Sequence, residues 1–490
     1  MSRSGHARLG DDTLAALPAT VVRPAYRRQD TRIGVVHLGI GAFHRAHQAV
    51  YLDDVLAHDP AWAICGVSLR SADVRDALQP QDGLYTLEML ETSPSYRVIG
   101  AVREVLCAPQ SQAELLARLA DPAVRLVTLT VTEKGYCLDG DTLNLAHPDI
   151  VRDLATPETP ASAIGYVVAG LRLRHARGLR PYTVLSCDNL PDNGGKLRRA
   201  CVAYARQFDA ALAEWIDAEA AFPRSMVDSI TPASDTALQA RVGTALGVED
   251  AWPVQREPYT QWVVEDRFCD GRPAWEQAGV TMSDDIAGYD RAKLRLLNAP
   301  HSTLAYLGLL LGLETVSDAM RDPVLGDFVA RLMRDHIAPN VALPAGFDAG
   351  GYIDAILARF ANPAVKHRLA QIAQDGSQKI PVRLLGTIAD ALAAGRGIDT
   401  LCLPVAGWLH FVRRQARAGI ALVDPLAERL AGIGRAATGE AEEDVASFLR
   451  LEPVFGGLAD DARFMTALRK AYGALGEGSA AQVSLALTSA

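Results

Sequence analysis

The first half of the chain alternates short apolar segments with amphipathic ones. Four segments are apolar almost without interruption, as is typical of strands covered on both faces of a parallel sheet: residues 33–38, 63–67, 126–131 and 183–186. Between them the apolar positions keep a helical spacing, which predicts helices at residues 46–57, 112–119 and 161–177. Strands that alternate with helices in this way predict an α/β fold with a doubly wound parallel sheet.

The second half changes to amphipathic helices joined by short polar connections. Asp322-Pro323 predicts a helix start, because aspartate is a favoured N-cap and proline is tolerated in the first turn. Further helices are expected at residues 351–360, 381–394 and 461–475. We therefore expect two domains: residues 1–283 with the doubly wound sheet, and residues 284–490, mainly α-helical.

The composition narrows the classes of function. The chain has 490 residues, and its net charge of -9 argues against a nucleic-acid partner. Its seven cysteines contain no CxxC pair, which predicts reduced thiols in a cytoplasmic protein without structural zinc. No apolar stretch is long enough to span a bilayer, so we expect no membrane partner. The oligomeric state stays open between a monomer and a small homo-oligomer.

Glycines and an acid follow the first two predicted strands, where ligands bind in open parallel sheets. Gly39 and Gly41 suit a tight turn and the close approach of a pyrophosphate to backbone N–H groups. His44 stands where a third glycine is usual, so the fingerprint is incomplete. Asp73 follows the second strand and could bind the adenosine ribose while repelling a 2′-phosphate. The alternative for Asp73 is a helix N-cap.

Polar residues also follow the third and fourth predicted strands. Thr132 and Glu133 lie after the third, and Asn189 lies after the fourth, within Asp188-Asn189. Asn189 could reach a nicotinamide or a reacting oxygen, although Asp-Asn pairs are also common in turns. We interpret Asn193-Gly194 as a turn.

Lys293, Asn298 and His301 are spaced to share one helix face at about 100° per residue. Leucines around Lys293 would disfavour its charged form and lower its pKa, so that it could accept a proton near neutral pH. The amide and the imidazole could hold an oxygen of the group being oxidised. The alternative is a solvated lysine, an N-cap asparagine and a core histidine. Pro300 argues against a continuous helix, whereas a break at Asn298, acting as N-cap, would place it in a first turn.

These motifs together resemble the mannitol dehydrogenase family of long-chain polyol and sugar-acid dehydrogenases. The likeness runs from Gly34 to Pro425 and lies in six segments: Gly-x-Gly-Ala-Phe-His-Arg-Ala-His (39–47), Thr-Glu-Lys-Gly-Tyr (132–136), Ser-Cys-Asp-Asn-Leu-Pro (186–191), Glu-Pro-Tyr-x-Gln-Trp-Val-x-Glu-Asp (257–266), Lys-x4-Asn-x2-His (293–301) and Asp-Gly-Ser-Gln-Lys (375–379). The resemblance implies an N-terminal Rossmann-type domain that binds NAD, a C-terminal helical domain, substrate between them, and no metal. Relatives commonly carry Gly-Ser or Gly-Ala where this chain has Ala299-Pro300.

The resemblance also implies roles for individual residues. Lys293 matches the general base, and Asn189 and Asn298 match the pair that positions the substrate oxygen. His301 matches a substrate-orienting imidazole, and Glu133 a residue that regulates proton exchange with solvent. Taken with the strand-end residues, the candidate cofactor contacts are Gly39, Gly41, Ala42, Phe43, Asp73, Thr132 and Asn189. The candidate substrate contacts are Asp228, Lys379, Arg383 and His301.

Two substrate classes fit this resemblance. Residues 371–383 look like the enzymes that reduce fructuronate, and Arg383 or Lys379 could bind the carboxylate of a sugar acid. An arginine paired with a surface acid is the alternative. Residues 63–67 and 250–254 look more like mannitol-type enzymes. We expect D-mannonate/D-fructuronate interconversion, with mannitol 2-dehydrogenase as the alternative and a catalytically inactive NAD-binding sensor as an alternative of another class.

Overall fold

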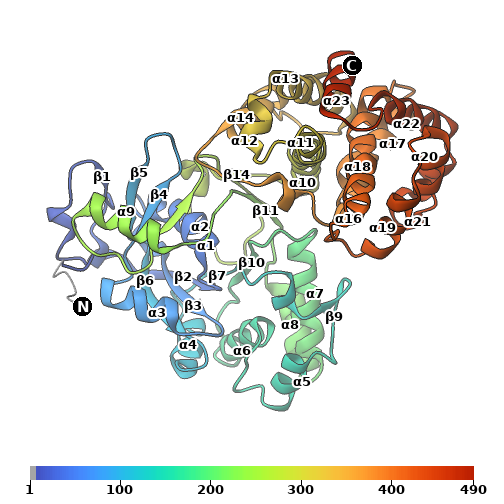
Figure 1. Ribbon diagram of the computed structural model, residues 1–490. Coiled ribbons are helices and arrows are strands. Elements are labelled where there is room, and N and C mark those ends of the chain that lie inside the picture. The colour runs from blue at the N-terminus through green and yellow to red at the C-terminus, as the bar shows by residue number, and fades with distance from the viewer. Residues whose placement is uncertain (1–6) are drawn as a thin grey trace. The chain divides into compact units, whose positions relative to one another are not determined.

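The computed structural model describes residues 7–490 and divides the chain into two compact units (Figure 1). The first unit ends at Ile286 and the second begins at Ala287. The first contains all the strands, and the second is built from helices. The predicted fold class, a doubly wound sheet domain followed by a mainly helical domain, is confirmed.

A five-stranded parallel sheet forms the centre of the first unit. Its strands lie in the order β10-β7-β2-β3-β6, with bounds β2 Ile33–Leu38, β3 Ala63–Ser68, β6 Val102–Cys107, β7 Leu126–Leu129 and β10 Thr183–Ser186. The sequence predicted all of these except β6, in which charged residues interrupt the apolar pattern. Because β3 and β7 flank β2 on opposite sides, the strand order reverses at β2, and the crevice beyond this point is the usual ligand site of such sheets.

Alternate residues of β2 face two different cores. Val36 and Leu38 belong to one buried cluster, and Val35 belongs to another on the opposite face. The predicted helix 46–57 corresponds to α2, which begins only at Gln48 because the backbone of His47 leaves the helical region and separates α2 from α1. The helices of this unit are α1 Ala42–Ala46, α2 Gln48–Val55, α3 Asp73–Leu78, α4 Gln112–Leu119, α5 Pro148–Ala155, α6 Ala163–Ala176, α7 Asn193–Arg206, α8 Ala210–Glu219 and α9 Thr236–Leu246.

Smaller sheets that the sequence did not predict complete the first unit. They contain strands of two to five residues, too short for a clear alternation of apolar positions. One sheet has the order β1-β5-β4-β12, a second β11-β13-β14, and β8 pairs with β9. Their bounds are β1 Val21–Val22, β4 Tyr85–Met89, β5 Ser95–Ile99, β8 Leu138–Asp139, β9 Thr142–Leu143, β11 Ser225–Asp228, β12 Val254–Arg256, β13 Gln261–Val264 and β14 Thr281–Met282.

In the second unit, helix α18 packs against α11, α19 and α22 around one large apolar core (Figure 1). The predicted start at Asp322 is confirmed, since its carboxylate accepts the N–H groups of Val324 and Leu325. The helices are α10 Ile286–Ala292, α11 Ala299–Leu310, α12 Val316–Arg321, α13 Pro323–Arg331, α14 Ala349–Ala361, α15 Leu369–Ile372, α16 Gly376–Ile380, α17 Gly386–Ala393, α18 Asp399–Arg417, α19 Ala427–Ala436, α20 Ala441–Leu449, α21 Glu452–Phe455, α22 Ala462–Ala474 and α23 Ala480–Thr488.

Three stretches of this unit are π-helical: η7 Lys293–Asn298, η8 Leu332–Ile337 and η10 Pro381–Leu385. A π turn widens the helix locally and occurs most often at functional sites. The predicted helix 381–394 is therefore the π turn η10 followed by α17. Across residues 7–490, none of the helices has both the length and the apolar character required to cross a membrane.

Candidate active site

The two glycines after β2 differ in what surrounds them. Gly39 has a φ of +98°, and a Cβ there would lie 2.2 Å from the Thr130 carbonyl oxygen after β7, so only glycine fits. A Cβ on Gly41 would meet only the Gly39 oxygen, at 3.8 Å. The packing of the protein thus explains why residue 39 is a glycine. The open side of Gly41, by contrast, leaves room for a ligand at the switch point. This arrangement fits the pyrophosphate of a dinucleotide.

The rings of two buried histidines stack on each other beside this loop. His44, at the position of the missing third glycine, stacks on His37 with ring centroids 3.3 Å apart. The His37 ring bonds the hydroxyls of Thr128 (2.7 Å) and Thr130 (2.8 Å). Burial lowers the pKa of His37 to about 3 and that of His44 well below its usual value, so both rings are neutral at physiological pH. His37 was not predicted, and its only sequence signal is a polar residue within an apolar strand.

Asp73 is exposed and is the first residue of α3, after the N-cap position Ala72. The N-cap alternative is therefore wrong, since Asp73 lies one residue further into the helix. A carboxylate in a first turn still interacts favourably with the helix dipole. The Asp73 side chain forms no hydrogen bond with residues 7–490, which leaves it available to a ligand.

The loop after β7 contains a strained residue. Thr132 has φ 64° and ψ 164°, a region that is nearly exclusive to glycine. The carboxylate of Asp188, after β10, accepts the N–H groups of Val131 and Thr132, both at 3.0 Å, and the hydroxyl of Tyr136 at 2.6 Å. Burial raises the pKa of Asp188, while these bonds favour its charged form. Asp188 therefore holds the strained loop in place.

Two predicted residues of the first unit lie next to the residues that this hydrogen bonding joins. Asn189 is the next residue and is exposed, and Glu133 is exposed at the start of the 3-10 turn that follows Thr132. Asp188 was not predicted as a functional residue, although it stands beside Asn189 at a strand end. Among the other predicted residues of this unit, Ala42 and Phe43 begin α1 after the glycine loop, and Asp228 is buried at the end of β11.

The interpretation of Asn193-Gly194 as a turn is wrong. Asn193 is buried and is the first residue of α7. Its amide donates to the Ser225 carbonyl oxygen at 2.8 Å, and its side-chain oxygen accepts the Ser225 N–H at 3.0 Å. A Cβ on Gly194 would lie 2.5 Å from the Phe222 carbonyl oxygen. The pair thus joins the loop after β10 to the segment that leads into β11.

In the second unit, Lys293 and Asn298 are the first and last residues of the π turn η7. The Ala299 N–H bonds the Leu294 carbonyl, five residues back, so the predicted spacing of about 100° per residue does not hold here. The predicted break at Asn298 is also wrong, because its backbone is helical and its side chain caps nothing. Pro300 is accommodated as the second residue of α11, which follows directly. Lys293 is buried, and Asn298 is half-buried.

His301, one turn further along, lies among aromatic and cationic side chains. Its ring centroid lies 4.3 Å from that of Phe360 and 5.4 Å from that of His367. Burial lowers its pKa well below the usual value, and Arg359, His367 and Arg383 lower it further. The ring is neutral, and it forms no hydrogen bond with residues 7–490. It can thus donate to or accept from a substrate hydroxyl.

Arg383 and Lys379 lie on consecutive helical segments, η10 and α16. One terminal nitrogen of Arg383 donates to the Ser302 hydroxyl at 3.1 Å and lies 3.5 Å from the Asn298 carbonyl oxygen. Arg383 forms no ion pair with any acid among residues 7–490, and burial lowers its pKa. Lys379 donates to the carbonyl oxygens of Ile372 and Gln374. Most N–H donors of Arg383 therefore have no partner among residues 7–490 and are available to a ligand. Lys379 has fewer available donors.

Two other features of the first unit lie outside the predicted residues. Cys137, His147 and Asp149 hold possible metal ligands within 4.8 Å of one another. His147 Nδ1, however, already accepts the Asp149 N–H and caps α5, and burial raises the pKa of the Cys137 thiol to about 11. We therefore interpret this group as a helix cap.

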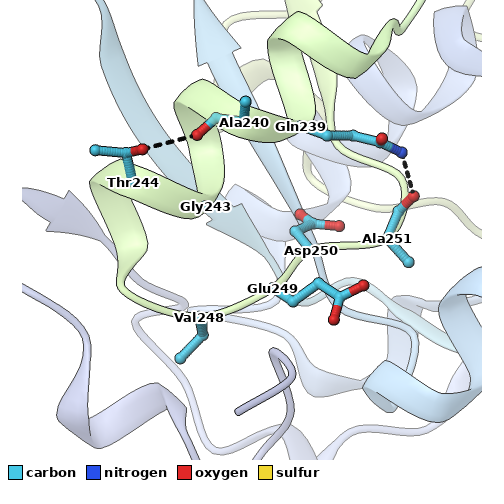
Figure 2. A pocket seen from close by; sticks show the side chains of 8 residues that line it. All are labelled: Gln239, Ala240, Gly243, Thr244, Val248, Glu249, Asp250 and Ala251. Atoms are coloured by element: carbon cyan, nitrogen blue, oxygen red, sulfur yellow. Dashed lines mark hydrogen bonds between the residues drawn. The ribbon is translucent and has the colours of Figure 1, made fainter. Parts of the chain in front are cut away.

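Figure 2 shows a cavity of about 400 Å³ between α9 and the segment that follows it. Asp250 lines it, but the Asp250 carboxylate is already bonded by the Gln81 amide and the Thr86 N–H. None of the predicted site residues lines this cavity.

Comparisons with known proteins agree on one family. The family model for the mannitol dehydrogenase Rossmann domain matches residues 33–277, and that for the mannitol dehydrogenase C-terminal domain matches residues 285–476. D-mannonate oxidoreductase of Escherichia coli is 39% identical over 95% of this chain and 98% of its own length. Mannitol 2-dehydrogenase of Phaeosphaeria nodorum is 39% identical over 96% of this chain and 83% of its own length. The structure of Pseudomonas fluorescens mannitol 2-dehydrogenase with NAD and D-mannitol is 38% identical, covers 97% of this chain and 98% of that one, and has a TM-score of 0.77.

Proposed function

Because the chain belongs to the mannitol dehydrogenase family, we propose that it is an NAD-dependent oxidoreductase that interconverts D-mannonate and D-fructuronate. Both domain models of the family match, and the relatives include enzymes named for a sugar acid and for a polyol. The choice of the sugar acid rests on a single observation, the environment of Arg383.

The guanidinium group of Arg383 has no anionic partner among residues 7–490. It is half-buried and lies beside His301 and the Asn298 carbonyl oxygen. A guanidinium that loses hydration without a counter-ion is unfavourable unless a ligand supplies the charge. A carboxylate matches its fork of donors in two parallel hydrogen bonds. A neutral polyol would leave the charge unpaired.

The residues of this chain have the following proposed roles in the reaction. A nicotinamide cofactor, held in part by the loop of Gly39 and Gly41, would supply the hydride chemistry at the carbinol carbon. Lys293 accepts the hydroxyl proton as the alcohol is oxidised, and gives it back during reduction. Asn189 and Asn298 donate hydrogen bonds to the oxygen on the reacting carbon, where negative charge develops. His301 orients the neighbouring hydroxyls, Glu133 exchanges the proton with solvent, and Asp228 contacts the substrate.

The proposed cofactor contacts lie at the switch point of the sheet. Gly39 and Gly41 shape the loop for the pyrophosphate, and Ala42 and Phe43 follow in the first turn of α1. Thr132 and Asn189 would contact the cofactor on the side of β7 and β10. Asp73 binds the adenosine ribose and disfavours NADP.

Mannitol 2-dehydrogenase is the second candidate, supported by a relative of that name at the same 39% identity. Replacing Arg383 with methionine and assaying fructuronate and fructose separates the two. We expect the KM for fructuronate to rise by at least about tenfold, because a charged hydrogen bond contributes about 1.5–3 kcal/mol. The KM for fructose should change much less.

The control is Arg414→Met, which removes an arginine that bonds only the backbone carbonyls of Leu309 and Leu310. An equal loss on both substrates in Arg383→Met would make Arg383 a structural residue. Absence of turnover with every ketose and keto-acid, while NADH still binds, would favour an inactive sensor.

A further inference from the structure

His367 lies in the loop between α14 and α15, and its backbone is fixed on both sides. Its N–H bonds the Val365 carbonyl at 2.8 Å, and its carbonyl accepts the Val316 N–H at 3.0 Å. The backbone of the next residue, Arg368, forms an isolated antiparallel β-bridge with Thr315. The loop therefore presents the His367 ring in a defined position.

The ring of His367 lies at the edge of the His301 ring. The ring planes are inclined by 79° and the centroids are 5.4 Å apart. Nδ1 of His367 is buried and has no hydrogen-bond partner among residues 7–490. A buried polar nitrogen without a partner is unfavourable, and a ligand group would satisfy it.

Cations, rather than acids, face this ring. After burial, Arg359 on α14 and Lys379 on α16 are the groups that lower the pKa of His367. The remaining titratable neighbour is His301 on α11, which itself faces Arg383. The carboxylates of Asp375 and Asp424 raise the pKa of Lys379 but are not among the groups that shift the pKa of His367. Burial first, and then the neighbouring cations, thus lower the pKa of His367 and favour the neutral ring.

We infer that His367 is a further specificity-determining residue, whose ring takes up a proton when the carboxylate of a sugar acid binds beside Arg383. The inference rests on the proposed function. An anion placed among these cations offsets their repulsion and favours the charged imidazole. His367 takes the proton more readily than His301, because His301 is more deeply buried and packs on Phe360. A neutral polyol brings no charge and causes no uptake.

Calorimetric titration of D-mannonate into the full chain with NADH present measures this proton directly, because mannonate and NADH cannot react with each other. Titrations in two buffers of different ionisation enthalpy give the number of protons bound. We expect uptake of up to about one proton with mannonate and none with D-mannitol. His367→Gln should still bind mannonate, more weakly and without uptake. His336→Gln is the matched control, since His336 is also half-buried with a lowered pKa.

A kinetic experiment extends the test to the reaction. The wild-type KM for fructuronate should rise with pH by up to about tenfold per unit, whereas the KM for fructose stays level. In His367→Gln the first slope disappears. Retained proton uptake in His367→Gln, or no binding of mannonate to the wild type, overturns the inference. If mannonate binds with uptake but fructuronate is not reduced, the proposed function fails and the role of His367 stands.

Discussion

Two polar side chains near the strand ends of the first unit, Asp188 and His37, are bonded within the protein, whereas those around Arg383 in the second unit have few internal partners. In the first, Asp188 accepts three hydrogen bonds and His37 bonds two threonine hydroxyls, all within the protein. In the second, Arg383 uses one nitrogen, and the imidazole rings of His301 and His367 form no hydrogen bond with residues 7–490. The side chain of Asp188 fixes the backbone of the first region, whereas the polar side chains named in the second region remain available to a ligand.

This difference suggests how the two regions divide the work. A backbone fixed by Asp188 and glycine suits a ligand that is the same in every turnover, such as a dinucleotide. Side chains without internal partners suit recognition of a substrate, because replacing one of them changes ligand binding without unmaking the fold. We therefore expect substitutions of Arg383 and His367 to alter specificity, and substitutions in the first region to alter stability and cofactor binding.

The largest effect should come from Lys293, the buried end of the π turn. Lys293→Ala removes the proposed proton acceptor, which contributes about two to four orders of magnitude in rate. Turnover and NADH fluorescence titration should be measured together, and cofactor binding should persist. A variant that retains more than about a tenth of wild-type turnover would exclude this role.

Asp188 tests the first region, and its removal should have the next largest effect. Asp188→Ala leaves the Val131 and Thr132 N–H groups without their acceptor, and each charged bond contributes about 1.5–3 kcal/mol. We expect a lower Tm and a loss in kcat/KM of about 10–100-fold, with Asp188→Asn recovering part of both. Asp192→Asn, an exposed acid of the same loop, is the control. Wild-type behaviour of Asp188→Ala would show that Thr132 holds its strained conformation unaided.

The stability of the first unit should depend on pH through His37. Its folded-state pKa of about 3 lies below the unfolded value, so its stabilisation is present above about pH 6.5 and is lost as the pH falls. Between about pH 7 and pH 5 this single ring should remove about 2 kcal/mol from the free energy of unfolding. Urea unfolding of His37→Gln should lack that portion of the pH dependence. Exposed His58 provides the control, and an unchanged slope in His37→Gln would contradict the assignment.

The smallest expected effect concerns Asp73, which no internal bond holds. Asp73→Ala should raise the kcat/KM ratio of NADP over NAD by several-fold, since a carboxylate near a 2′-phosphate is repulsive. The comparison uses wild type and variant with both cofactors. An unmoved ratio, or a wild-type preference for NADP, would leave Asp73 with only its place in the first turn of α3.

The sequence predicted the fold better than the fine structure of the site. Strands β2 and β10 match the prediction because strands covered on both faces are apolar throughout. The π turn at Lys293 escaped prediction, since α-helical and π-helical spacing place the apolar residues of so short a segment almost identically. Asp188 and His367 contact residues distant in sequence, Thr132 and His301, which local patterns do not connect.

We propose that Arg383, which forms no ion pair with an acid among residues 7–490, recognises a carboxylate of the substrate. The most direct test is the ratio of kcat/KM for D-fructuronate and D-fructose in the wild-type protein, followed by the loss of NADH absorbance. We expect fructuronate to be preferred by at least about tenfold, because the neutral sugar leaves the Arg383 guanidinium unpaired. Faster reduction of fructose than of fructuronate would contradict it and assign the chain to mannitol 2-dehydrogenase activity.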